Sequence, residues 1–363
     1  MFVIRNARPE DADTLLKLAK MVHFINLPAD PDIIAAKIQR SRSSFAGKAT
    51  NEREREFMFV LEDSETGNVI GTSTAISCMS WPGKPHIYFN VRKREHYSKD
   101  LQTGAVHVTM QLETDESGPS EIGGLILSPS YRGHKHKLGS FLSLIRFHFV
   151  GLHPQWFSER MIAEMMAPLT PDSRNTLWEY LGRRFINLTY AEADRFCQHS
   201  KEFMTSLLPS AEIYVSLLPP EARNLIGKVG TETRPALAML ESLGFQYEGH
   251  VDPFDGGPYL SAVTRDISVV RDTCEMQFGG ISERNSDTHA MVSVHRRGTF
   301  TAIKSACTID AEKKAIYLPS NAVDRLQLEP GESLGVTEST RKPTQPQPAT
   351  ESRQPSPATT PTL

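Results

Sequence analysis

The sequence predicts an α/β protein in which a mixed β-sheet is flanked by helices. Residues 2–7 alternate in hydrophobicity as a short strand, and Pro9 precedes a segment with apolar residues at helical spacing. Residues 57–77 read as two strands joined by a turn at 65–68. Residues 125–147, LILSPSYRGHKHKLGSFLSLIRF, begin as a strand and end as an amphipathic helix. Strands therefore alternate with helices along the chain.

The rest of the chain continues this alternation. Further strands are predicted in HIYFNV, AVHVTMQLET, EIGGLILS and MIAEMMAPL, whereas TYAEADRFCQHSKEFMTSLLP has the pattern of a helix. The polar stretch 40–56 is predicted to be a surface connection, with or without a helical turn. Residues 174–185 and 234–251 each predict a helix ended by Leu-Gly, with a strand beginning near Phe185 or Phe245. The two phrases are either a faint internal repeat or two instances of a common junction.

Composition excludes several classes of protein. The formal net charge of -3 over 363 residues lacks the basic excess of a nucleic-acid binder. Four cysteines without a CxxC pair indicate neither a disulfide framework nor a zinc site, and no metal is expected. The first residues carry charges where a signal peptide needs an apolar core, and no apolar run is long enough to span a membrane. We therefore expect a cytoplasmic globular protein.

Cations cluster where the strand of residues 125–147 gives way to its helix. The turn runs Arg132-Gly133-His134-Lys135-His136-Lys137. Unpaired N–H groups at a helix start, together with the helix dipole, favour an anion there, and Arg suits bidentate contact with phosphate. The turn predicts a pyrophosphate cradle, and the alternative is a solvated basic turn.

Longer phrases resemble a known enzyme family. The order of strand, helix, hairpin, GGLILS, YRG and LGSFLSLIRF is similar to the acyl-CoA-dependent N-acyltransferases of the GNAT type. FVLEDSETGNVIGTSTA, SEIGGLILSPSYR, LWEYLGRRF, EARNLIGKVG and DPFDGGP resemble the arginine N-succinyltransferase family, over about 1–260 and more loosely to Val336. The resemblance implies a GNAT-like sheet, transfer of succinyl from succinyl-CoA to the α-amino group of L-arginine in arginine catabolism, no permanently bound cofactor, and association with itself or a paralogue.

The resemblance also implies where the acyl-CoA binds. Its expected contacts lie on the strand and on the basic turn: Leu125, Leu127, Arg132, Gly133, Lys135, Lys137 and Gly139. The family pattern for the cradle is Arg/Gln-x-x-Gly-x-Gly/Ala. Here it is lengthened from Arg132, or else His134, Lys137 and Gly139 fill the frame, and both registers stay open.

Candidate catalytic residues come partly from the residue types. Glu121, at the start of the same strand, is the first candidate for the base, and its alternative is a solvated strand end. Glu164, a carboxylate within an apolar strand, is the second, or else it pairs with a structural arginine such as Arg183 or Arg184. His250 is the candidate acid or base because histidine titrates near neutrality. The resemblance assigns a histidine as proton donor just after the IG-x-V phrase, but Gly230 stands at that position here.

Asp252 and Asp255 are candidates for binding the guanidinium of arginine, or else they cap their own turn through its backbone. We expect an acyl-CoA-binding domain at 1–190, a second, GNAT-like half completing the substrate site at 191–265, a small β-rich module at 266–337 and a disordered Pro/Thr/Ser-rich tail at 338–363. Two other functions remain open: an N-acyltransferase for another amino acid or amine such as ornithine, and a non-catalytic acyl-CoA-binding subunit.

Overall fold

The structure, a computed structural model, describes residues 1–21, 27–170, 174–197, 200–283 and 288–338. Its helices and strands are β1 (Phe2–Asn6), α1 (Ala12–Lys20), α2 (Pro31–Phe45), β2 (Glu56–Asp63), β3 (Asn68–Ile76), β4 (His86–Ser98), β5 (Thr103–Asp115), β6 (Ser120–Leu127), α3 (Leu138–Leu152), β7 (Arg160–Glu164), α4 (Arg183–Phe185), α5 (Tyr190–Cys197), α6 (Glu202–Leu207), β8 (Ile213–Tyr214), α7 (Pro220–Arg223), α8 (Arg234–Ser242), β9 (Gln246–Val251), β10 (Pro258–Val263), α9 (Ser268–Asp272), β11 (Thr273–Ile281), β12 (His289–Arg296), β13 (Thr299–Ala306), β14 (Thr308–Asp310), β15 (Ala315–Leu318), α10 (Ser320–Leu326) and β16 (Ser333–Glu338).

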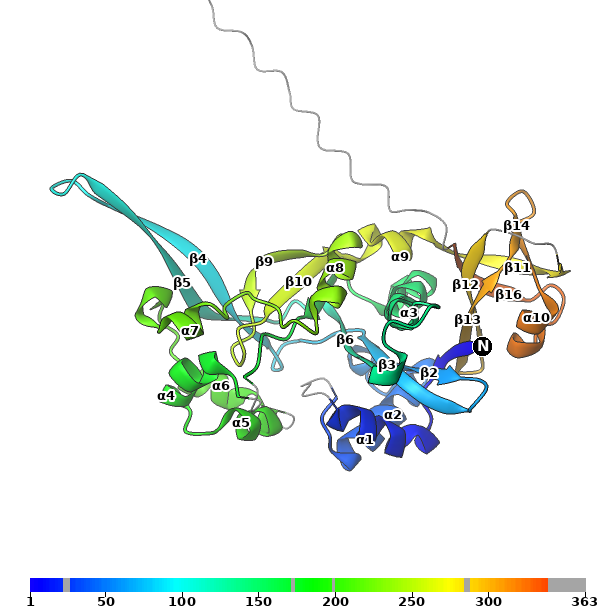
Figure 1. The fold of residues 1–363 in the computed structure, drawn as a ribbon, viewed down its shortest axis with the longest axis horizontal. Helices are drawn as coiled ribbons and strands as arrows, with labels where there is room; N and C mark the ends of the chain where they lie inside the picture. Colours follow the sequence, from blue (N-terminus) through cyan, green and yellow to red (C-terminus); the bar gives the residue numbers. More distant parts are fainter. Residues whose placement is uncertain (22–26, 171–173, 198–199, 284–287, 339–363) are drawn as a thin grey trace, which may run out of the picture.

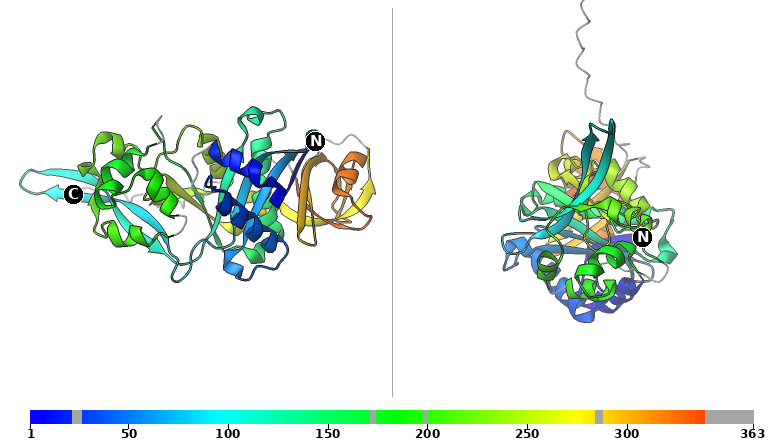
Figure 2. Two further views of the ribbon diagram at one scale, coloured as in Figure 1. Left: turned by 90° about the horizontal axis from the view of Figure 1, so that it is seen from below. Right: turned by 90° about the vertical axis from the view of Figure 1, so that its left-hand side faces the viewer.

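One continuous mixed sheet runs through the described part of the chain. Its strand order is β14-β15-β11-β16-β12-β13-β1-β2-β3-β6-β7-β10-β9-β4-β5-β8. Because β1 pairs with both β2 and β13, the C-terminal strands extend the same sheet. The long β4–β5 hairpin projects from one end and the C-terminal strands lie at the other (Figures 1 and 2). The predicted fold class, a mixed sheet flanked by helices, is confirmed.

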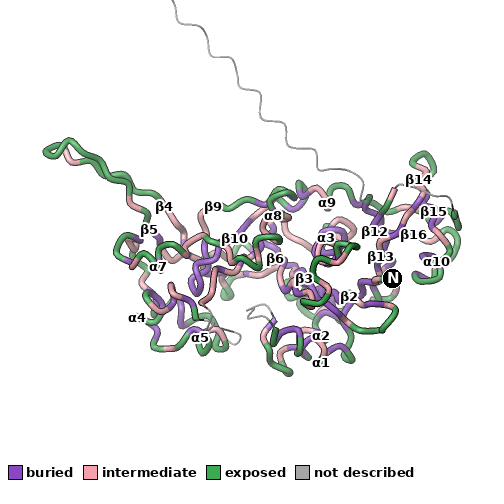
Figure 3. Tube along the Cα trace, in the orientation of Figure 1, coloured by how far each residue is buried: buried purple, intermediate pink, exposed green. Residues whose placement is uncertain are grey.

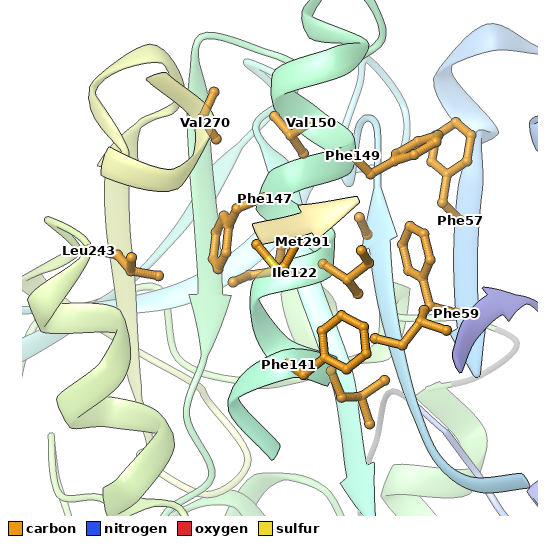
Figure 4. Close-up of a cluster of buried hydrophobic side chains, with 14 of the residues drawn as sticks. Phe57, Phe59, Ile122, Phe141, Phe147, Phe149, Val150, Leu243, Val270 and Met291 are labelled. Carbon is orange, nitrogen blue, oxygen red and sulfur yellow. The ribbon is translucent and has the colours of Figure 1, made fainter. Parts of the chain in front are cut away.

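Helices cover both faces of the sheet. Strand β2 shows why, because its apolar side chains are buried on both faces. Phe57 and Phe59 point into the cluster that holds α3, whereas Met58 and Val60 point into the cluster that holds α1 and α2. Successive side chains of a strand face opposite sides. Figure 4 shows Phe57 and Phe59 beside Phe149 of α3. The central strands are therefore buried on both faces, and α3 forms the centre of the largest core.

The C-terminal β module is tied to α3 by buried polar contacts. The imidazole of His148 lies 2.6 Å from Thr337 Oγ1 and 2.7 Å from Ser293 Oγ. A separate apolar cluster fills the module itself. Its last strand, β16, ends at Glu338, one residue past the boundary expected at 337. Of the tail predicted to be disordered, 338–363, Glu338 belongs to β16 and residues 339–363 lie outside the described residues.

Residues 40–45 were expected in a surface connection, but they form the end of α2. Asp30 caps this helix by accepting N–H bonds from Asp32 and Ile33, at 2.9 and 3.1 Å. Ser41 and Ser44 of this segment are buried, and their hydroxyls accept the N–H groups of Met58 at 2.9 Å and Glu56 at 3.0 Å. In the sequence, serines that bind a buried strand look the same as serines that face water. The polar pattern therefore predicted a surface connection where α2 continues.

The two Leu-Gly phrases differ in structure. Trp178–Gly182 is a π-helical segment that runs on into α4, so no strand begins at Phe185 as expected. A side chain at Gly182 would meet the ring of Trp178, which stacks on Phe254 with centroids 4.8 Å apart. In the second phrase Gly244, at φ +105, ends α8 and β9 follows, as predicted. The likeness between the phrases therefore does not extend to their folds.

The β4–β5 hairpin is exposed along its outer half (Figure 3). Tyr97, Leu101 and Val106 are among its exposed apolar residues. No helix in the described part of the chain is both long and apolar enough to span a membrane.

Candidate functional site

The site begins where two parallel strands separate. β6 pairs with β7 over Ser120–Ile122 only; beyond that point β6 continues beside β3, and β7 pairs with β10. A β-bulge bends β6 at Gly124, which has φ +56, since two residues there face one residue of β3. The edge of β6 from Gly123 to Leu127 is therefore turned away from β7. Its backbone can pair with an extended ligand laid beside it.

The basic turn follows directly on this strand. Arg132, Gly133, Lys135 and Lys137 are exposed. Lys137 precedes α3 with φ 49, the left-handed conformation that glycine adopts most readily. The N–H groups of the first turn of α3 have no partner within the helix. The turn thus combines exposed cations with a helix N-terminus.

The predicted acyl-CoA contacts follow one another along β6, the basic turn and the first turn of α3. Leu125 and Leu127 are partly buried against the main core, and a side chain at Gly139 would touch Leu127 at 3.8 Å. Arg132 forms an exposed ion pair with Glu232, with Nη1 and Oε2 2.8 Å apart. These contacts therefore extend from the free edge of β6 to the start of α3.

Four carboxylates gather on the face of the sheet opposite α3. Ile122 and Ala163 belong to the core around α3, so Glu121 and Glu164, one residue away on each strand, point to the other face. Tyr259 of β10 lies opposite Glu164, and its hydroxyl donates a 2.9 Å bond to Asp252. Asp255 completes the group, which we call the acid cluster: Glu121, Glu164, Asp252 and Asp255.

Burial raises the pKa of three members of this cluster, Glu164, Asp252 and Asp255. Burial raises the pKa of Glu164 well above its ordinary value, and the charges of Asp252, Asp255 and Glu121 raise it further. Burial, followed by the charge of Asp252, raises the pKa of Asp255 to about 7. Lys201 acts in the opposite direction on the pKa of Glu164. A bound cation would relieve this repulsion.

Exposure separates Glu164 from the rest of the cluster. Glu121 is 7% exposed, Asp252 5% and Asp255 1%, whereas Glu164 is only partly buried. Among the described residues, none donates a hydrogen bond to the Glu164 carboxylate or pairs with it as a cation. Glu164 is therefore the least buried residue of the acid cluster.

Asp252 and Asp255 build their own turn, the alternative given above. Asp252 Oδ1 accepts the N–H groups of Phe254 and Asp255 at 2.7 and 3.1 Å. Asp255 accepts those of Gly257 at 2.6 Å and Ala167 at 2.9 Å. These bonds fasten the turn to the end of β7. Binding of a guanidinium by these two residues stays a prediction.

Gly257 permits this close approach. A β-carbon at Gly257 would lie 2.0 Å from the carbonyl oxygen of Met165. Gly256, at φ +79, adopts a conformation that other residues rarely take. The DGGP phrase thus reflects two backbone requirements next to Glu164.

His250 lies in a different group from Glu121. It is on β9 opposite Asn90 of β4, and its ring is 4.2 Å from that of Tyr88. Burial lowers its pKa, and Arg160 lowers it further. Sequence reasoning missed His86, a buried histidine whose ring lies 4.6 Å from that of Tyr259. Burial lowers the pKa of His86 to about 3, so it is neutral. Its segment, HIYFNV, gave only the signal of a strand.

Gly230 lies beside the end of β7. Its N–H donates a 3.0 Å bond to the carbonyl of Met166. An added β-carbon would lie 3.4 Å from the oxygen of Ala167, an ordinary contact, and the backbone is not in the left-handed region. A β-carbon therefore fits at this position. Within the described ranges, no three His, Cys, Asp or Glu side chains form a group that could hold a metal ion.

Comparisons with known proteins agree on one family. A family model described as arginine N-succinyltransferase beta subunit matches residues 2–269. The arginine N-succinyltransferase of Yersinia pestis (strain Pestoides F) is 39% identical over 276 residues, covering 75% of this chain and 78% of that one. That of Escherichia coli O139:H28 is 35% identical over 274 residues, covering 75% and 78%. The solved arginine/ornithine succinyltransferase subunit AI from Pseudomonas aeruginosa has a TM-score of 0.80 at 24% identity, covering 93% of this chain and 98% of that one.

Proposed function

Because the chain belongs to the arginine N-succinyltransferase family, we propose that it transfers the succinyl group of succinyl-CoA to the α-amino group of L-arginine. The family match includes β6, α3, β7 and the DGGP turn, so every part of the candidate site lies within it. The observation that carries the proposal is the position of Glu164, a partly buried residue with a carboxyl group of raised pKa, beside the point where β6 and β7 separate.

The donor binds along β6 and the basic turn in this proposal. The pyrophosphate of succinyl-CoA lies at the N-terminus of α3, held by N–H groups and by Arg132, Lys135 and Lys137. The left-handed backbone of Lys137 supports the register in which His134, Lys137 and Gly139 fill the family frame, since Lys137 then takes the place of a glycine. The pantetheine arm pairs with the free edge of β6, and a backbone N–H near Leu125 holds the thioester oxygen.

Glu164 acts as the base. A general base works best with a pKa near the working pH, and burial among carboxylates shifts the pKa of Glu164 in that direction. Glu121 lies next to it on the same face and adds negative charge. His250 on β9 is the other candidate. The charges that act on it belong to Arg160, Glu248, Glu113 and Asp115 and not to the acid cluster, so this geometry gives His250 less support than Glu164.

The acceptor is a cation. An amino acid with a positively charged side chain would relieve the repulsion within the acid cluster, which favours arginine over neutral amines. Ornithine also carries such a charge. Turnover measured with succinyl-CoA and a panel of L-arginine, L-ornithine and neutral amino acids tests the assignment, and equal rates for neutral and cationic acceptors would contradict it.

The thiolate leaves without the histidine that the family places after IG-x-V. A thiol has a pKa of about 8.5, so the thiolate is a tolerable leaving group near neutral pH. Gly230→His supplies a proton donor to the departing thiolate and should raise kcat, because a β-carbon fits at this position. A variant that folds, binds succinyl-CoA and gains no rate would show that proton donation at this point is not limiting. Cytoplasmic location and association with a second subunit stay predictions.

A further inference from the structure

A buried arginine lies in the middle of α3 without an anionic partner. Arg146 is 3% exposed. Its Nε donates to the carbonyl of Ser143 at 3.0 Å, its Nη2 to the hydroxyl of Ser143 at 2.6 Å, and its Nη1 to the carbonyl of Gly123 at 3.4 Å. All of these acceptors are neutral. Among the residues that the structure describes, no carboxylate pairs with this guanidinium.

A buried cation without a counter-ion is uncommon, because desolvation penalises the charge. Burial alone lowers the pKa of Arg146 to about 9, and it still carries its charge at neutral pH. Arginine has more N–H donors than its three bonds here use, and its Nη1 and Nη2 can together hold one carboxylate. The side chain therefore has both the charge and the free donors for a small anion.

Its position connects it to the acyl donor. Gly123 is the first residue of β6 beyond the last pair with β7, so the guanidinium lies at the point where the strands separate. Gly139 and Arg146 are seven positions apart and share one face of α3. At about 1.5 Å per residue, Arg146 lies about 14 Å along the helix axis from Lys137. A donor held at the cradle and laid along β6 brings its acyl end toward Arg146.

The acid cluster lies on the opposite side of the sheet. Arg146 approaches the strands from the α3 face, whereas Glu121 and Glu164 point to the opposite face. An acyl group between the separating strands can therefore meet a cation on one side while the amine approaches from the other. The separation also explains why no carboxylate of the cluster neutralises Arg146.

We propose that Arg146 binds the terminal carboxylate of the succinyl group and thereby selects a dicarboxylic acyl donor. The proposal rests on the proposed function and assigns the donor specificity of the same site. Acetyl-CoA offers no anion to Arg146, which would then stay buried and unpaired beside a neutral acyl group. A site built around a buried polar partner discriminates strongly against an analogue that lacks it, so we expect succinyl-CoA to be preferred by at least about a hundredfold.

The test uses the full chain and two readouts. We would measure kcat/KM with succinyl-CoA and acetyl-CoA, and, without any acceptor, the Kd of succinyl-CoA, acetyl-CoA and CoA by calorimetry. Arg146→Gln should weaken succinyl-CoA binding by at least about tenfold, and leave the Kd of acetyl-CoA and CoA within about twofold. Arg132→Gln, in the cradle, provides the matched contrast, because it should weaken all three ligands alike.

Several results would overturn the proposal. Equal weakening of all three ligands in Arg146→Gln would make Arg146 a structural support for β6. If that variant does not fold, Arg146→Lys carries the test: it keeps the charge and loses the fork, so the preference should fall, and an unchanged preference would refute the assignment. Transfer to arginine at equal rates from succinyl-CoA and acetyl-CoA would refute the role of Arg146 and leave the proposed function standing. Selective binding of succinyl-CoA that depends on Arg146, without transfer to arginine, would refute the proposed function and leave the role of Arg146 standing.

Discussion

Replacement of Glu164 by glutamine isolates the base. Glu164→Gln keeps the size of the side chain and removes the proton acceptor. Loss of a general base typically costs about a hundredfold to ten-thousandfold. The α-amino terminus of a peptide has a pKa of about 8, and that of a free amino acid is higher, so fewer than roughly one acceptor in ten is unprotonated at pH 7 without a base. We expect kcat/KM to fall about a hundredfold to a thousandfold at pH 7, and to recover by about tenfold or more by pH 9.

The same variant should not lose stability. The pKa of Glu164 is raised in the folded protein by burial, so the folded state binds this proton more tightly than the unfolded chain does. That contribution to stability is present below the unfolded pKa of about 4.3 and is lost as the pH rises through the folded pKa. Glutamine carries no charge at any pH. Glu164→Gln should therefore melt at or above the wild-type temperature at pH 8, with a smaller difference at pH 5.

The assay combines steady-state rates from pH 6 to 9 with melting curves at pH 5 and 8. Glu159→Gln is the matched control, since Glu159 is an exposed glutamate just before β7 and should leave both quantities unchanged. An unchanged kcat/KM in Glu164→Gln would refute its role as base. A melting temperature several degrees lower at pH 8 would refute the account of its burial.

Three further predictions concern the donor site, the turn and the tail. Replacing Arg132 and Lys135 together by alanine should raise KM for succinyl-CoA and affect KM for arginine much less; an unchanged donor affinity would remove the cradle. Gly257→Ala should lower the melting temperature by about 5–10 °C, from about 3 kcal/mol of overpacking, whereas Gly67→Ala, in open surroundings, should cost less than half as much, and equal effects would contradict this. Deleting residues 339–363 should leave the melting temperature and donor affinity nearly unchanged, and a fall of many degrees would show that the tail packs on the fold.

Local sequence patterns predicted more of the fold and of the donor site than of the acceptor site. The cations between strand and helix marked the basic turn because the turn is contiguous in sequence. Glu121 and Glu164 are 43 positions apart, and only the pairing of β6 with β7 puts them on one face. Which of them a substrate can reach depends on packing, which the sequence does not display.

Other misses have equally local causes. Arg146 did give a signal, as a charge within the apolar phrase LSLIRF, but the absence of a partner is visible only in three dimensions. His86 is hidden in a strand pattern, and its contact with Tyr259 depends on strands far apart in the chain. The serines of α2 read as a solvated stretch because a hydroxyl that holds a buried backbone looks like one that faces water.

The most direct test of the central claim is to incubate the purified protein with succinyl-CoA and L-arginine and to identify the products by mass spectrometry. The account predicts one free CoA for each arginine that gains a succinyl group, with the group on the α-nitrogen. It also predicts that Glu164→Gln slows this reaction while still binding the donor. Tight binding of succinyl-CoA with no transfer to arginine or any other amine would contradict the enzyme assignment and leave a non-catalytic acyl-CoA-binding subunit.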